Sequence, residues 1–110
     1  MSTRNQQVKP LEKRTRRPVH PGAVLREDVL PSLGITQGEF ARKLGVSRKT
    51  INEVLTERRP ISADLAHRLG RLLGNGPGLW LRMQQQVDLW DALHLDNRPY
   101  QSIQPLEHAA

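Results

Sequence analysis

Cysteine is absent from this chain of 110 residues, which excludes disulfide bonds, thiolate metal sites and thiol nucleophiles. Apolar stretches are only a few residues long, so no segment is expected to span a membrane. The N-terminal residues are polar and basic and lack the apolar region that a secretory signal requires. Since this length allows one modest core, we expect a soluble, cytoplasmic protein.

Acidic residues are in the minority, with 11 Asp and Glu against 17 Lys and Arg, for a formal net charge of +6. The excess lies toward the N-terminus: residues 1–20 hold six basic residues and one acidic residue, whereas residues 61–110 hold four and five. This charge favours an anionic partner. We expect a basic flexible arm over residues 1–17, a domain over 18–93 and an irregular tail over 94–110. An arm that is merely solvated fits the same pattern.

The middle of the chain shows successive helix patterns, and no segment has the alternation of a strand. The fold is therefore expected to be all-α, with five helices. They are expected to begin at Pro21, Thr36, Ser47, Ser62 and Pro77 and to end at Gly34, Gly45, Arg58-Arg59-Pro60, Gly74 and Leu93. Within the first helix, Pro31 predicts a break or kink in the last turn. The residues of this helix expected to face the core are Val24, Leu25, Val29 and Leu33.

Residues 36–55 have the spacing of a helix-turn-helix. Thr36 and Glu39 form a capping box at the start of the first helix of this pair. Ala41 is small enough to let the two helices approach, and Gly45 suits the turn. The angle between the helices is expected to be filled by Val46, Ile51 and Val54.

The second helix of this pair has the chemistry of a DNA-reading helix. With its apolar edge facing inward, the 100° step turns Lys49, Asn52 and Glu53 outward. Lys and Arg can bind guanine, Asn can bind adenine and Glu can bind cytosine. Gln37 is placed to bind a phosphate together with free backbone N–H groups. The residues expected to contact DNA are Thr36, Gln37, Ser47, Arg48, Lys49, Thr50, Asn52, Glu53, Arg58 and Arg59.

A charged outer helix face is usually only solvated, and any helical bundle has capped helices. Here, however, a turn glycine, a small alanine, a hydrophobic triplet and local basic density coincide. That coincidence favours DNA binding.

The sequence resembles the HigA-type antitoxins of the lambda-repressor-like (Xre) helix-turn-helix group. The resemblance covers about residues 18–93. Besides residues 36–55, it rests on His20-Pro21-Gly22-x-Val24-Leu25, Leu33-Gly34-Ile35-Thr36-Gln37, Ile61-Ser62-Ala63-Asp64-Leu65-Ala66-x-Arg68-Leu69-Gly70 and Leu79-Trp80-Leu81-x-Met83-Gln84. The chain departs from the family at Ala23, where an acidic residue is usual, and at the Gly76-Pro77-Gly78 entry to the last helix.

The resemblance implies a type II antitoxin that represses its own promoter as a dimer and binds a RelE/HigB-like toxin that cleaves mRNA. It implies base-reading roles for Arg48, Lys49 and Glu53, a phosphate contact for Gln37 and a backbone contact for Arg59. A stand-alone Xre-type regulator without a toxin is the alternative.

The last expected helix, from Pro77 to Leu93, is the candidate dimerisation helix, because aromatic anchors are typical of interfaces. The expected interface residues are Leu79, Trp80, Met83, Val87 and Trp90. The alternative is that both tryptophans close the core of a single chain.

That the protein is an enzyme is the competing hypothesis from another class of function. The histidines at positions 20, 67, 94 and 108 lack metal-ligand spacing, and no GxSxG motif occurs. We expect no catalytic site, metal or cofactor, and we assign His20 to the start of a helix. A module that binds only protein is the third reading.

Overall fold

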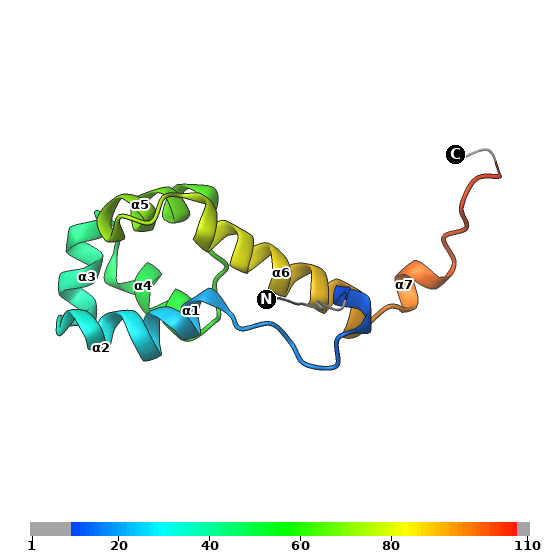
Figure 1. Ribbon diagram of the computed structural model, residues 1–110, viewed down its shortest axis with the longest axis horizontal. Coiled ribbons are helices and arrows are strands. Elements are labelled where there is room, and N and C mark those ends of the chain that lie inside the picture. The colour runs from blue at the N-terminus through cyan, green and yellow to red at the C-terminus, as the bar shows by residue number, and fades with distance from the viewer. Residues whose placement is uncertain (1–9, 108–110) are drawn as a thin grey trace, which may run out of the picture.

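The computed structural model describes residues 10–107, and its regular elements are all helical, which confirms the all-α prediction (Figure 1). In chain order they are η1 (Leu11–Lys13), α1 (Pro21–Val24), η2 (Leu25–Val29), α2 (Leu30–Leu33), α3 (Gln37–Leu44), α4 (Arg48–Leu55), α5 (Ala63–Leu73), α6 (Gly78–His94) and α7 (Arg98–Gln101). Helices α1 to α5 form a bundle at one end, from which α6 extends toward α7 (Figure 1). Within residues 10–107 no helix combines the length and apolarity needed to cross a membrane.

The first helix is continuous from Pro21 to Leu33 and changes its hydrogen-bond pattern midway. Residues 25–29 form a π turn, in which the Leu30 N–H donates to the carbonyl of Leu25. Proline has no N–H to donate and disturbs the preceding turn of an α-helix, and a π turn is one way in which a helix absorbs such a disturbance. Pro31 therefore does not break the helix, which instead has a π turn shortly before this residue.

The core prediction for the first helix is correct for Leu25, which is fully buried, while Val24 and Val29 pack against the core at partial exposure. The prediction is wrong for Leu33, whose side chain is 46% exposed. Leu33 lies in the last turn before Gly34, where residues 31–34 are all exposed and no other element of the described chain covers them.

Helix α3 begins and ends as its sequence predicts. The Glu39 N–H donates to Thr36 Oγ1 at 3.1 Å, and the Thr36 N–H donates to Glu39 Oε1 at 2.9 Å, so both halves of the capping box form. These bonds, with the backbone N–H of Thr36 as the leading cause, lower the pKa of Glu39. Gly45 ends the helix at φ 74°, a conformation that glycine adopts without strain.

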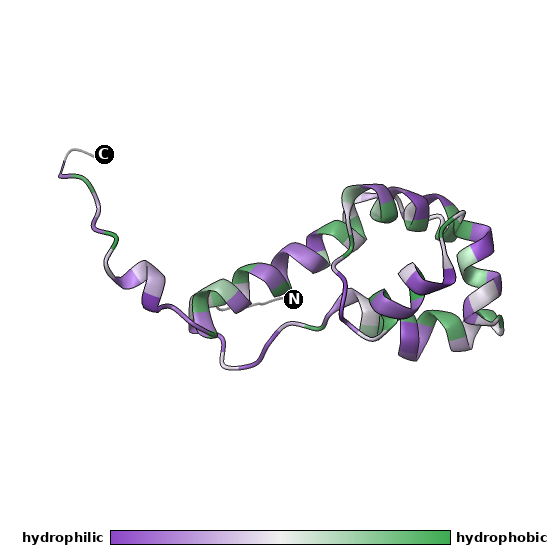
Figure 2. Ribbon diagram, turned by 180° about the vertical axis from the view of Figure 1, so that it is seen from behind, coloured by the Kyte–Doolittle hydropathy of each residue, from purple (hydrophilic) through white to green (hydrophobic). Residues whose placement is uncertain are grey.

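The core lies between the first helix, α3, α4, α5 and the first half of α6. Its fully buried side chains include Leu25, Phe40, Ile51, Val54 and Leu69. Hydrophobic and hydrophilic residues alternate along the helices of the bundle, as amphipathic helices require (Figure 2). Gly22 allows the first helix and α4 to approach each other closely, because a Cβ at this position would overlap the backbone carbonyl of Val54 at the end of α4.

The part of the expected arm that the structure describes lies against α6. Residues 1–9 are outside the described range, but the η1 turn contacts α6, and the indole N–H of Trp90 donates to the carbonyl of Arg14 at 3.2 Å. The domain therefore includes contacts from residues N-terminal to the expected boundary at residue 18.

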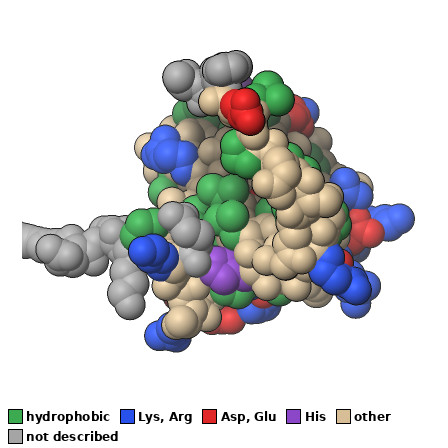
Figure 3. All heavy atoms as spheres, turned by 90° about the vertical axis from the view of Figure 1, so that its right-hand side faces the viewer, with side chains coloured by type: hydrophobic (Ala, Val, Ile, Leu, Met, Phe, Trp, Pro, Cys, Tyr) green, Lys and Arg blue, Asp and Glu red, His purple; other side chains and the backbone are tan. Residues whose placement is uncertain are grey.

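Beyond α6 the expected irregular tail contains the short helix α7, which the sequence analysis did not foresee. Hydrophobic side chains are visible on the face seen from this end of the molecule (Figure 3). Those exposed in the tail are Leu95, Tyr100, Ile103 and Leu106.

Candidate nucleic-acid interface

Helix α4 is held with one face inward and the opposite face open. Ile51, Val54 and Leu55 are buried, as the helical spacing predicted. Lys49 and Asn52 are exposed on the outward side, and Arg48 is exposed at the helix start. The inward apolar edge therefore fixes which polar side chains of α4 face solvent.

The start of α3 lies beside this outward face. Asn52 Nδ2 is 3.5 Å from Gln37 Oε1, the limit of a hydrogen bond, across the two helices. Thr36, at the N-cap of α3, lines a hollow between the two helices together with Gly38, Ser47 and Arg48. The structure thus brings the expected phosphate contact and the expected base contacts to one surface.

The hydroxyl groups of Ser47 and Thr50 serve the helix itself. Ser47 Oγ accepts the backbone N–H of Thr50 at 3.0 Å, and the two side-chain oxygens are 2.9 Å apart. These bonds satisfy a backbone donor at the start of α4. Both residues were expected to contact DNA, and the structure gives each of them a capping bond at the edge of that surface.

Glu53 and Arg59, expected as separate DNA contacts, form an ion pair. The Arg59 Nη2 and Nε donate to Glu53 Oε1 at 2.6 and 2.9 Å. The hydrogen bond from Arg59 is the main reason that the pKa of Glu53 lies below its usual range. The turn after α4 brings the pair together. Glu57 adopts φ 63° in this turn, and the N–H groups of the next two residues, Arg58 and Arg59, both donate to the Glu53 carbonyl. The Arg58 side chain is exposed.

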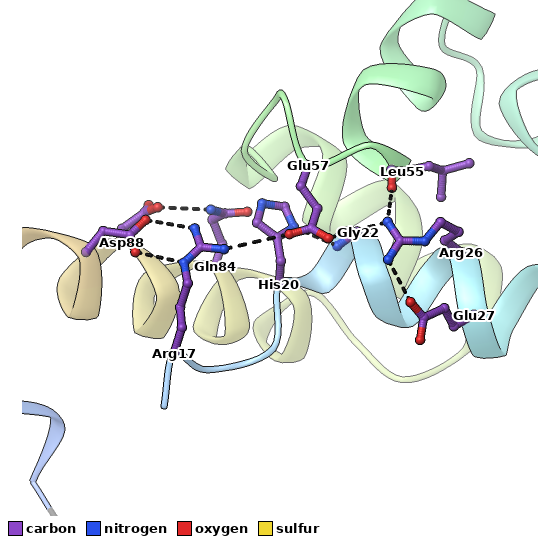
Figure 4. Close-up of polar contacts among 10 residues, drawn as sticks. Arg17, His20, Gly22, Arg26, Glu27, Leu55, Glu57, Gln84 and Asp88 are labelled. Atoms are coloured by element: carbon purple, nitrogen blue, oxygen red, sulfur yellow. Dashed lines mark hydrogen bonds and ion pairs between the residues drawn. The ribbon is translucent and has the colours of Figure 1, made fainter. Parts of the chain in front are cut away.

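A second ion-pair network holds the end of α4 against the first helix (Figure 4). The Arg26 Nη1 donates to the Leu55 carbonyl at 2.6 Å and lies 3.4 Å from Glu57 Oε2. Arg17 Nη1 lies 3.7 Å from the other oxygen of Glu57. Arg26 therefore satisfies a carbonyl in the last turn of α4, a role that no local sequence signal indicates.

His20 caps the first helix, as expected. Its Nδ1 accepts the Gly22 N–H at 2.9 Å, and the ring is buried (Figure 4). Burial is the main cause that lowers the pKa of His20, which favours the neutral ring that this bond requires. The prediction for His20 is confirmed.

Gln84 is a buried polar residue whose role the sequence analysis missed. Its Oε1 accepts the Ile61 N–H at 2.9 Å. Its Nε2 donates to Asp88 Oδ1 at 3.0 Å (Figure 4). Gln84 thus attaches the segment before α5 to the inner face of α6. A polar residue on a buried face weakens the apolar periodicity, and the Trp-Leu-x-x-Gln pattern was the only signal for it.

The expected dimer residues on α6 divide into two sets. Trp80 and Val87 are 2% and 1% exposed within the single chain, and the Trp80 indole N–H donates to Asn75 Oδ1 at 3.2 Å. Their assignment to a dimer surface is therefore corrected, because the bundle already encloses them. Leu79 is exposed, Met83 is half-buried, and the half-buried Trp90 stacks on His94 with ring centroids 4.3 Å apart.

Among residues 10–107, no three His, Asp or Glu side chains are grouped so that they could hold a metal ion.

The helix-turn-helix family model matches residues 25–80. Antitoxin HigA-1 of Vibrio cholerae is 34% identical over 96 residues, which are 87% of this chain and 90% of that protein. Among solved structures, the Pseudomonas aeruginosa antitoxin HigA with the higBA promoter has a TM-score of 0.75 at 37% identity, with 82% of this chain and 99% of that chain covered. Antitoxin GraA in complex with its operator has a TM-score of 0.76 at 39% identity, with 86% and 96% covered.

Proposed function

The chain belongs to the helix-turn-helix family, and from that premise we propose that it binds promoter DNA and represses its own operon as the antitoxin of a type II toxin–antitoxin system. The observation that carries the proposal is the α3–α4 pair, whose outward face presents Arg48, Lys49 and Asn52 to solvent. Related proteins that are antitoxins by name were solved with a promoter or an operator, which supports the same role here.

The role that we propose for each residue on DNA follows from what its side chain contacts in the free protein. Lys49 and Asn52 have exposed donors and reach base edges in the major groove, as does Arg48. Gln37 and Arg58 contact the phosphate backbone. Glu53 pairs with Arg59 in the free protein, so the main effect of Glu53 is on the net charge of the surface and not on the recognition of a base.

A dimer completes the proposal, since one helix-turn-helix covers only one half-site and two half-sites lie roughly 34 Å apart. The interface we propose is the outer side of α6, where Leu79 and Met83 are followed by Leu89 and Leu93, which are 51% and 40% exposed. Apolar side chains exposed along one helix suit burial against a second chain.

The proposed protein partner is a RelE/HigB-like toxin that cleaves mRNA, encoded by the neighbouring gene. Repression is steric, because a bound dimer keeps polymerase from the promoter. Both activities belong in the cytoplasm.

A gel shift with the DNA upstream of the chain's own gene, with and without the product of the adjacent gene, tests the proposal. We expect salt-sensitive binding that exceeds binding to a scrambled duplex, and a further shift when the adjacent gene product is added. Specific binding with no response to that product identifies a stand-alone regulator instead. A failure to prefer the upstream DNA overturns the proposed function.

A further inference from the structure

Gly38, the second residue of α3, lies directly beneath the guanidinium of Arg48, the first residue of α4. A Cβ atom added to Gly38 would lie 3.0 Å from Nε, 3.1 Å from Nη2 and 3.2 Å from Cζ of Arg48. Three such similar distances place that point above the guanidinium plane, not in line with one N–H bond. The Arg48 side chain therefore lies across the first turn of α3.

We infer that Gly38 is a positioning residue, which sets where the Arg48 guanidinium lies on the DNA-facing surface and thereby contributes to operator specificity. The inference rests on the proposed function, because it concerns how Arg48 reaches DNA. It adds a residue outside the set expected to contact DNA.

The backbone of α3 gives no other reason for a glycine at this position. The glycines with positive φ in the described chain are Gly34, Gly45, Gly74 and Gly76, so Gly38 has a conformation open to other residues. Glycine is also a poorer helix former than alanine. What the missing side chain provides is the space that the Arg48 guanidinium occupies.

This space matters because arginine reads guanine through two parallel hydrogen bonds, whose strength depends on the placement of a rigid fork. A side chain at position 38 forces the fork to shift by a few tenths of an ångström. Since the displaced group is the end of a flexible, exposed side chain, Arg48 moves and the fold persists.

Gly78 provides a matched control. It begins α6, which packs mainly on α5, and a Cβ there would also meet an arginine guanidinium, that of Arg82. Gly38→Ala and Gly78→Ala therefore make the same chemical change against the same kind of neighbour, and only the first affects the DNA-facing surface.

The experiment compares the wild type, Gly38→Ala, Arg48→Ala, the double variant and Gly78→Ala, each titrated on the upstream DNA and on an unrelated duplex. We expect Gly38→Ala to lower the preference for the upstream DNA at least about fivefold, the lower end of a bidentate contact. In the Arg48→Ala background the same substitution should have no further effect. Gly78→Ala should bind as the wild type does, and the melting temperature of Gly38→Ala should equal or exceed that of the wild type.

An unchanged preference in Gly38→Ala overturns the inference. So does an equal loss in the wild-type and Arg48→Ala backgrounds, since Gly38 would then act without Arg48. If the wild type itself shows no preference for the upstream DNA, the proposed function fails, and that result is visible before any variant is compared.

Discussion

Arg17 and Asp91 are joined by two parallel hydrogen bonds of 2.8 Å, from Nε to Oδ1 and from Nη2 to Oδ2. The two residues are 74 positions apart in the sequence. Together with the bond from Trp90 to the Arg14 carbonyl, this pair holds the segment before the first helix against α6. The end of the expected arm thus belongs to the folded domain.

Asp91→Asn should lower the free energy of unfolding by about 0.5–1 kcal/mol at pH 7, the value of a well-aligned exposed ion pair. The hydrogen bonds from Arg17 lower the pKa of Asp91 in the folded state. This contribution is therefore present above the ordinary aspartate pKa of about 3.9 and is lost as the pH falls through the lower folded value. Urea unfolding at several pH values should show the free energies of unfolding of the two proteins converging as the pH falls below the ordinary aspartate pKa. A constant difference would contradict the assignment.

Gly22→Ala should destabilise the fold by about 1–3 kcal/mol or more, because its Cβ overlaps the Val54 carbonyl and backbone must move. Gly78→Ala serves as the control, since its Cβ meets only the end of the Arg82 side chain. Thermal unfolding of the two variants measures the difference. Equal melting temperatures would mean that the first helix and α4 separate without cost.

Lys49→Ala should weaken binding to the upstream DNA by about 1–3 kcal/mol and leave the fold intact, because the side chain is exposed on α4. Arg98→Ala removes the same charge from α7, at the far end of the molecule (Figure 1), and should have little effect. Titration at one fixed salt concentration measures both. Similar losses of affinity in the two variants would show that Lys49 contributes only through the net charge of the protein.

Glu53→Gln should strengthen binding to unrelated DNA, because it removes the negative charge that pairs with Arg59. The slope of log affinity against log salt should steepen by about one. Measuring the same variant on the upstream DNA separates the two roles of Glu53. A weaker preference for that DNA, with an unchanged slope, would show that the carboxylate reads a base.

Leu89→Glu should shift the protein from dimer to monomer, because it places a charge on the exposed apolar side of α6. Leu106→Glu is the control, since this residue is exposed in the tail beyond α7. Sedimentation of the two variants at one concentration is the measurement. An unchanged dimer in Leu89→Glu would remove this side of α6 from the interface.

The sequence alone determined the features that depend on neighbours along the chain. Thr36 and Glu39 are three residues apart, and Gly45 follows the helix that they begin, so propensity and capping suffice to predict α3. The spacing of Ile51, Val54 and Leu55 likewise determined which face of α4 is open, and with it the positions of Lys49 and Asn52.

The tertiary structure decided what depends on residues distant in sequence. Trp80 and Val87 have the same apolar character whether they face a second chain or the core, and only the folded chain shows that both side chains are buried within it. The partners of Arg17 and the space beneath Arg48 arise from elements that meet only in the folded chain. Periodicity records the hydrophobicity of a face, whereas the identity of the group that covers it is a property of three-dimensional packing.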